Sequence, residues 1–278
     1  MAEPADIRVL VRGLHHPEGV AALPDGTLVC GSDHGRLYRA DPVESRSHLL
    51  AELPGASFLG ICVDGDGGVL ACDIGQRQVV RWDGQGFEVL SAPPGGWSHP
   101  NALCFLADDR LVVSDSGRWG HPSGRLVALG PDGVEVLGLG DLAFANGLCV
   151  DADGEQLWVV ESARPAVSRI YLGQTGPRVT ARIELPGCVP DGVAALTDGT
   201  VLVTCFRPDQ ILHLGTSVEV LAADPTGLRL SGPTNLAFFG TGLTQAAVAC
   251  FGAYHLAGIE SPVGGATSYR PHWRPTVA

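Results

Sequence analysis

The sequence predicts an all-β fold, a six-bladed β-propeller with four antiparallel strands in each blade. One sequence phrase recurs six times, the leading residues of its copies (Glu18, Leu59, Asn101, Asn146, Asp191 and Thr234) are spaced by 41, 42, 45, 45 and 43 residues, and each repeat contains short apolar segments separated by turns. Periods in the forties are typical of arrays of similar sheets that stack on one another. Because the repeats fill the chain without a linker, we expect residues 1–278 to form a single domain.

The repeated phrase supplies the first two strands of each blade. It begins with turn-forming or polar residues, passes through a small residue into an apolar stretch, and ends at a turn rich in Asp and Gly. A second apolar stretch follows at once, as in PEGVAALPDGTLVCGSD from Pro17, and this pattern is typical of a β-hairpin. The copies begin at His16, Leu59, Pro100, Ala145, Pro190 and Pro233.

Third and fourth strands follow in the rest of each repeat. Third strands are expected over residues 35–41, 77–83, 124–130, 168–173, 209–215 and 253–260. Fourth strands read SHLLAEL, GFEVLS, VEVLG, VTARIEL and VEVLAA, which leaves the last repeat one strand short. The segment IRVLVRG from Ile7 precedes the first repeat in the place of a fourth strand. We expect this N-terminal strand to complete the last blade and close the ring, which removes an open sheet edge.

Composition and charge narrow the classes of partner. Lys and Arg total 18 against 30 Asp and Glu, and a net charge of -12 opposes the phosphates of nucleic acids. No run reaches the roughly eighteen apolar residues of a membrane span. The N-terminal stretch lacks the apolar core of a signal peptide, because Arg8 and Arg12 interrupt it. We expect a cytoplasmic protein that acts on a small molecule, in an oligomeric state that the sequence leaves open.

Three of the eight cysteines occupy the same position of the repeat. Cys62, Cys104 and Cys149 stand where the other copies have Ala21, Ala194 and Ala237. A position shared by Ala and Cys is expected to be a small, buried strand position, so we interpret these cysteines as core residues rather than metal ligands or redox groups. The chain has no CxxC pair, and free thiols agree with a reducing compartment.

The first strand of each blade lines the central channel, so the residues at its start form a ring at one mouth. In chain order the ring is Glu18, Leu59, Asn101, Asn146, Asp191 and Thr234. Two carboxylates and two amides that converge would repel or stay poorly satisfied without a cation, and their hard oxygens suit Ca²⁺. Mn²⁺, Mg²⁺ and Zn²⁺ are the alternatives. Asn or Asp before Gly also forms turns, but a turn preference does not account for four such side chains on one ring.

Several of these segments resemble the senescence-marker-protein (regucalcin)/gluconolactonase family. They are PEG from Pro17, SDSGRWGHPSGRLVAL from Ser114, ANGL from Ala145, PDGV from Pro190 and PTNLAF from Pro233. The resemblance spans nearly the whole chain. It implies a six-bladed propeller that binds one divalent metal, usually calcium, at the channel mouth and hydrolyses lactones.

The resemblance also implies roles for the ring residues. Glu18, Asn146 and Asp191 match the metal ligands, and Asn101 matches a residue that contacts metal or substrate. The metal would polarise the lactone carbonyl and stabilise the oxyanion that forms on attack. Asp191 would be the general base or a direct nucleophile, and the sequence leaves both roles open. Asn101 and Asp191 are therefore the expected catalytic residues.

Residues near the ring are candidates for the substrate pocket. Sugar-lactonase members carry an Arg two residues before the third ring position and an Asp just after it, whereas this chain has His99 and Ala102, so gluconolactone itself is not the expected substrate. The roles of His15 and His16, which precede Glu18, stay open between an ordinary loop and acid–base chemistry. The expected pocket residues are His99, Arg118, Trp119, Tyr254 and His255.

Two other functions remain open at this point. The same mouth could belong to a biosynthetic enzyme that catalyses ring closure or elimination, as in strictosidine-synthase-like propellers. It could also belong to a ligand-binding propeller without catalysis, since a fold does not imply a function. The complete set of four oxygen-bearing ring residues favours the metal-dependent hydrolase.

Overall fold

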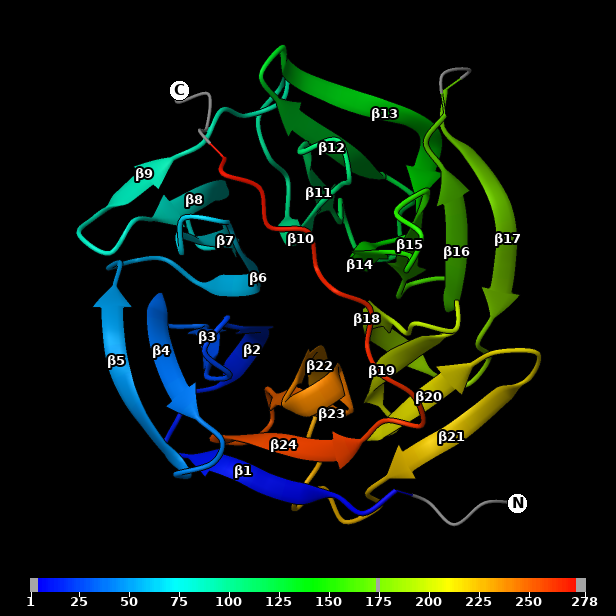
Figure 1. Ribbon diagram of the computed structural model, residues 1–278. Helices are drawn as coiled ribbons and strands as arrows, with labels where there is room; N and C mark the ends of the chain where they lie inside the picture. Colours follow the sequence, from blue (N-terminus) through cyan, green and yellow to red (C-terminus); the bar gives the residue numbers. More distant parts are fainter. Residues whose placement is uncertain (1–4, 174–175, 274–278) are drawn as a thin grey trace.

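The computed structural model describes residues 5–173 and 176–273, and it confirms the predicted propeller. Six four-stranded antiparallel sheets surround a central channel (Figure 1). The first three blades comprise β2 (Pro17–Ala22), β3 (Leu28–Ser32), β4 (Arg36–Asp41) and β5 (Arg46–Glu52); β6 (Phe58–Val63), β7 (Val69–Asp73), β8 (Gln78–Trp82) and β9 (Phe87–Val89); and β10 (Pro100–Phe105), β11 (Leu111–Asp115), β12 (Gly124–Gly130) and β13 (Gly133–Leu142). The next two comprise β14 (Ala145–Val150), β15 (Gln156–Glu161), β16 (Ala166–Tyr171) and β17 (Arg178–Glu184); and β18 (Val189–Ala195), β19 (Val201–Arg207), β20 (Gln210–Leu214) and β21 (Val218–Ala223).

The N-terminal strand closes the ring, as the sequence predicts. The last blade contains β22 (Pro233–Phe239), β23 (Gln245–Cys250) and β24 (His255–Glu260), and its fourth strand is β1 (Arg8–Arg12). β1 pairs antiparallel with β24, and Arg12 lies opposite His255. A short 3-10 helix, η1 (Thr241–Leu243), joins β22 to β23. Among the described residues, no helix is long and apolar enough to cross a bilayer.

The hydrophobic core lies between the blades. Six buried apolar clusters each draw their residues from two neighbouring blades, as where Leu196 and Leu202 of the fifth blade pack with Phe238 of the sixth. Outer strands such as β17 and β21 are mostly exposed. Burial of apolar surface between blades therefore holds the ring together and fixes the inner strands β2, β6, β10, β14, β18 and β22 around the channel.

Every inner strand has a register shift at its ring residue. Pairing with the second strand shifts between Pro17 and Val20, Phe58 and Ile61, Pro100 and Ala102, Ala145 and Leu148, Pro190 and Val193, and Pro233 and Leu236. Such β-bulges release a side chain from the regular alternation of the strand and re-aim it. The position that carries the candidate site is therefore irregular in all six blades.

The residue after each ring position allows neighbouring inner strands to approach closely. It is Gly in four of the six blades, and Ala102 and Asn235 in the other two. A Cβ on Gly147 would lie 2.4 Å from the carbonyl oxygen of Asp191, and one on Gly192 would lie 2.4 Å from that of Thr234. The inner strands thus contact one another backbone to backbone beside the ring.

The position shared by Ala and Cys packs against the core clusters between the blades, as predicted, but it is only partly buried. Cys62, Cys104 and Cys149 are each partly accessible, because the position faces the interior of the channel. Ala21, Ala194 and Ala237 face it as well. The cysteines remain free thiols, as expected, and burial raises the pKa of Cys104 to about 12.

The C-terminal segment crosses the end of the channel opposite the ring (Figure 1, red). Gly265 forms a bridge with Leu196, just beyond the end of β18. Further along, the amide of Gly65 donates to the carbonyl of Pro271 over 2.7 Å, and Trp273 packs against Phe105 with a centroid distance of 5.6 Å. The segment therefore lies over the blades as a loop that is fixed at several points.

Candidate metal and substrate site

The four oxygen-bearing ring residues lie at the same end of the channel. Glu18, Asn101 and Asn146 are each the second residue of an inner strand, and Asp191 is the third residue of β18. All four are buried, with exposed fractions of 5 to 8%. Thr234 completes this side of the ring, and its hydroxyl donates to the carbonyl of Glu18 over 2.7 Å.

Hydrogen bonds to serine orient both ring amides. Asn101 Nδ2 donates to Ser116 Oγ and Asn146 Nδ2 donates to Ser162 Oγ, each over 3.0 Å. Each serine in turn donates to the next blade, Ser116 to the carbonyl of Ala145 and Ser162 to that of Pro190, both over 2.6 Å. With the amide nitrogens held in this way, the amide oxygens are left for another partner.

Three buried oxygens of the ring have no hydrogen-bond partner among the described residues. They are Asn101 Oδ1, Asn146 Oδ1 and Asp191 Oδ1. Buried polar atoms are rarely left unpaired, because an unpaired one loses the hydrogen bonds of water without replacement. Three acceptors together, with carboxylate charge beside them, fit a divalent cation with a preference for hard oxygen ligands.

The two ring carboxyls show the electrostatic cost of this arrangement. Burial raises the pKa of Asp191 to about 8, although the nearby Asn146 amide acts in the opposite direction. Burial, and then the negative charge of Asp191, raise the pKa of Glu18 well above its usual range. A cation at the ring would stabilise both carboxylates in their charged form and so counteract both shifts, and the residues present fit a bound metal ion.

Calcium is expected to raise the Tm of the protein more at pH 8 than at pH 5.5. In the metal-free protein the pKa of Asp191 is raised from 3.8, so the stability contributed by this carboxyl is full below about pH 4 and is lost as the pH rises towards 8. Calcium binding must displace the proton at pH 5.5 but meets a more ionised site at pH 8. Differential scanning fluorimetry with EDTA or excess CaCl₂ measures the two shifts, and equal shifts would contradict a raised pKa at the site.

The serine contacts are functional features that the sequence analysis missed. Ser116 and Ser162 each follow directly after the acidic residue that ends a second strand, in SDS and VES. That repeated acid–serine pair is the signal that would have found them. Its meaning depends on contacts with asparagines 15 and 16 residues earlier in the chain.

Ser162→Ala is expected to weaken calcium binding about 10- to 100-fold, as is typical when a group that orients a metal ligand is removed. Without the hydroxyl, the Asn146 amide can rotate and its oxygen no longer points reliably into the ring. Isothermal titration calorimetry measures the affinity. Ser168→Ala is the matched control, because Ser168 is also buried but bonds to Arg182 away from the ring. Unchanged affinity in Ser162→Ala would remove the orienting role.

The acids that end the second strands fix the entry of the inner strands. Each accepts a backbone N–H from the loop before the inner strand of its own blade. The pairs are Asp73 with Ser57 at 2.8 Å, Asp115 with His99 at 2.6 Å and Glu161 with Ala143 at 2.6 Å. Asp115 and Glu161 also pair with Arg125 and Arg164. These acids therefore position the ring through the backbone.

The predicted pocket residues of the third blade lie on loops around the ring. His99 comes two residues before Asn101, and its Nδ1 lies 3.2 Å from Ser98 Oγ. Arg118 is exposed. Trp119 is 54% exposed, and its ring meets that of Phe144 edge to face at 4.9 Å. Phe144 directly precedes β14 and its ring residue Asn146.

The predicted residues of the last blade separate into two environments. Tyr254 is 55% exposed and its ring lies 4.8 Å from that of His16 and 5.7 Å from that of His15. His16 is held by a 2.8 Å contact with the Phe251 carbonyl. His255 is buried instead, and its Nε2 lies 2.8 Å from the carbonyl of Arg229. The structure thus places Tyr254 beside the histidines that precede Glu18, and His255 inside the packing of the blade.

Aromatic side chains gather on the loops and strand ends around the ring. We call this set the aromatic rim, and it comprises Trp119, Phe144, Phe206, Phe251 and Tyr254. Phe206 and Phe251 lie 6.5 Å apart on neighbouring blades. The sequence analysis named Trp119 and Tyr254 as pocket residues but not the three phenylalanines, although Phe206 and Phe251 each follow directly after a cysteine at the same position of the repeat.

Comparison with known families identifies the family of the chain. The model of the SMP-30/Gluconolactonase/LRE-like region matches residues 34–250. The chain belongs to this family. A strictosidine synthase-like N-terminal model also matches residues 6–40. No curated protein matches the chain in sequence.

Solved structures of similar proteins share the fold over nearly their whole length. A putative gluconolactonase is 20% identical, covers 96% of both chains and has a TM-score of 0.78. A calcium-binding protein, regucalcin, from Agrobacterium tumefaciens is 16% identical, covers 98% of both chains and has a TM-score of 0.77. A gluconolactonase from Xanthomonas campestris is 19% identical, covers 93% of this chain and 90% of the other, and has a TM-score of 0.75. At these identities the similarity shows the propeller fold.

Proposed function

We propose that this protein is a divalent-metal-dependent hydrolase of a lactone or a related small ester, with Ca²⁺ as the metal. The observation that carries the proposal is the set of three unpartnered oxygens on Asn101, Asn146 and Asp191, buried on one ring together with Glu18. Membership of the SMP-30/gluconolactonase family supports it, as do structural neighbours named gluconolactonase and regucalcin.

In this proposal Glu18, Asn146 and Asp191 hold the metal, and Asn101 contacts metal or substrate. Glu18 and Asp191 supply two negative charges, and the amide oxygens supply neutral ligands that Ser116 and Ser162 keep aimed at the ring. When bound, the ion would polarise the scissile carbonyl and stabilise the oxyanion formed on attack.

Asp191 is the residue proposed to move the proton. A carboxylate has two oxygens, so one oxygen of Asp191 can hold the metal while the other accepts a proton from a water molecule that attacks the carbonyl. Direct attack by the carboxylate is the alternative; it would break the lactone C–O bond, release the ring oxygen as an alcohol and leave an acyl anhydride on Asp191, which water attacking the Asp191 carbonyl would then hydrolyse. Single-turnover hydrolysis in ¹⁸O-labelled water distinguishes them, because only direct attack first incorporates an unlabelled oxygen from Asp191 into the product.

The surroundings of the ring favour a less polar substrate than a sugar lactone. Ala102 is buried beside Asn101 and offers no hydrogen bond from its side chain. The aromatic rim presents apolar ring surface around the mouth, including the exposed Trp119 and Tyr254. Apolar and aromatic surface of this kind favours alkyl or aryl bodies over polyhydroxylated ones. We therefore propose an alkyl- or aryl-substituted lactone.

Hydrolysis of a lactone panel tests the proposal. δ-Decalactone, dihydrocoumarin and gluconolactone are assayed with EDTA and then with Ca²⁺, Mn²⁺, Mg²⁺ or Zn²⁺ added back. Turnover that EDTA abolishes and Ca²⁺ restores, greater for the first two substrates, is the expected result. Calcium binding without turnover on any of the three would reject the lactonase and favour a ring-closing or eliminating enzyme, towards which the strictosidine synthase-like match points.

A further inference from the structure

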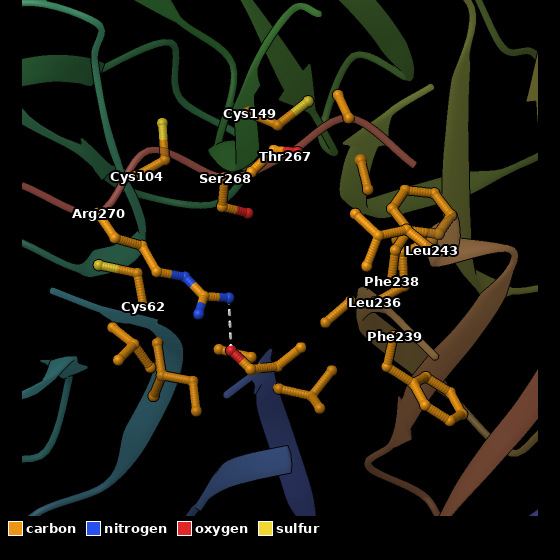
Figure 2. A pocket seen from close by; sticks show the side chains of 18 of the residues that line it. Cys62, Cys104, Cys149, Leu236, Phe238, Phe239, Leu243, Thr267, Ser268 and Arg270 are labelled. Carbon is orange, nitrogen blue, oxygen red and sulfur yellow. Dashed lines mark hydrogen bonds between the residues drawn. The ribbon is translucent and has the colours of Figure 1, made fainter. Parts of the chain in front are cut away.

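A large cavity occupies the channel at the end opposite the ring. It has a volume of about 840 Å³ and is lined by the later parts of the inner strands, the hairpins that follow them and the C-terminal segment (Figure 2). Among the described residues that line the cavity, the four ring residues Glu18, Asn101, Asn146 and Asp191 are absent. Since each inner strand runs from the ring into this cavity, the cavity begins at residues next to the ring, such as Gly60 and Ala102, and extends to the opposite end of the channel.

Apolar side chains of the inner strands line the cavity, together with polar groups of the hairpins and the C-terminal segment. Figure 2 shows Leu236, Phe238, Phe239 and Leu243 on one part of the wall, and Cys62, Cys104 and Cys149 elsewhere around it with their sulfur atoms directed away from the cavity. The repeated Ala or Cys position thus keeps the channel wide. Larger side chains at this position of the repeat would fill the space.

One cationic side chain enters this apolar space. Arg270 extends from the C-terminal segment into the cavity, and its Nη2 donates to the carbonyl of Ala22 over 2.7 Å (Figure 2, dashed line). Burial lowers the pKa of Arg270, and no carboxylate of the described residues pairs with it. The acidic residue of the lining, Asp25, is bonded to Thr27 and Arg39 instead. The guanidinium is therefore partly desolvated without a counter-charge, which is costly unless an anion joins it.

The chain on both sides of Arg270 is fixed, so its position is built into the fold. Ahead of it, Ala266 donates to the carbonyl of Ala195 over 2.8 Å. After it, Pro271 accepts from Gly65, and Trp273 is buried with an exposed fraction of 7%. The arginine is thus held over the cavity rather than on a free tail.

We propose that this cavity binds a small carboxylate with an apolar body, such as a medium-chain fatty acid. The apolar side chains of the wall contact the hydrocarbon part of the ligand, and Arg270 pairs with its carboxylate by charge-assisted hydrogen bonds. One guanidinium with no second cation in the lining matches a monoanion. The site is distinct from the ring and does not depend on the proposed hydrolase activity.

Calorimetric titration of the EDTA-treated protein with octanoate and decanoate tests the proposal. EDTA prevents the carboxylate from binding through a metal at the ring. Decanoate is expected to bind with a stoichiometry near one, and 1-decanol is expected to bind at least about tenfold more weakly, because it lacks the charge that pairs with Arg270. Equal binding of decanoate and 1-decanol, or no binding of either acid, would overturn the proposal.

Two variants test separately the charge of Arg270 and the free volume of the cavity. Arg270→Gln is expected to lose the preference for acid over alcohol, and Cys149→Trp is expected to lose both ligands because the indole fills the cavity. Arg46→Gln is the matched control, since the Arg46 side chain is 72% exposed on an outer strand. Circular dichroism confirms the fold of each variant, and wild-type affinity in Arg270→Gln would reject the role of the guanidinium.

Discussion

Asp191→Asn is expected to lower kcat/KM for the best lactone by at least about 10³-fold while the propeller stays folded. The substitution keeps the size of the side chain but removes a negative charge from the ring and the acceptor proposed for the proton of the attacking water. General-base catalysis alone typically contributes about 10² to 10⁴. Loss of a charged metal ligand lowers kcat/KM further. Kinetics should therefore be measured across a calcium titration, which separates weaker calcium binding from lost proton transfer.

The same variant should make the metal-free protein more stable. The Asp191 charge is disfavoured by burial and raises the pKa of Glu18 beside it, so an uncharged amide relieves both at pH 8. Scanning fluorimetry in EDTA should show a higher Tm than wild type, and calcium should add less. Asp198→Asn is the control, because Asp198 lies in the exposed hairpin of the same blade and bonds to Thr200. Wild-type turnover in Asp191→Asn at saturating calcium would remove this residue from the mechanism.

The fold could be predicted because its information is local and repeated. Each blade carries its own turns and apolar segments, and six copies of a weak pattern make a strong one. Ring closure followed from counting strands, since IRVLVRG had no other place. The ring positions of Glu18, Asn101, Asn146 and Asp191 could be found in the same way. Residues at the same position of each repeat lie at the same level along the channel axis.

The features that the sequence did not predict depend on which neighbouring blade, core cluster or cavity each strand face contacts. A position that faces the channel and one that faces a packed core both favour small residues, so the sequence did not show that Cys104 and Ala194 also line the channel. Ser116 and Ser162 act across blades, where each serine bonds to a carbonyl 29 or 28 residues further on. The repeat fixes heights in the channel but not these lateral contacts, and the contact of His255 with the Arg229 carbonyl is another of this kind.

Gly147→Ala is expected to destabilise the protein by about 1–3 kcal/mol, the usual cost of forcing extra volume into a tightly packed site. The new Cβ would lie 2.4 Å from the Asp191 carbonyl oxygen, 2.6 Å from the Gly192 Cα and 2.9 Å from the Val193 nitrogen. All three are backbone atoms of β18, so no side chain can rotate away. The strands β14 and β18 must separate, and urea unfolding measures the loss.

Separation of β14 and β18 should also lower the affinity for calcium, and this effect distinguishes it from a change that only destabilises the fold. Asn146 and Asp191 lie on the two strands that move apart, so their oxygens would no longer converge on one ion. Gly138→Ala is the matched control, because a Cβ there meets nothing within 4 Å, and its stability should change by no more than about 0.5 kcal/mol. If Gly147→Ala kept both wild-type stability and wild-type calcium affinity, close strand approach would not be a requirement of the site. A loss of calcium affinity larger than the loss of stability explains would show that Gly147 brings the oxygens of Asn146 and Asp191 within reach of a single cation.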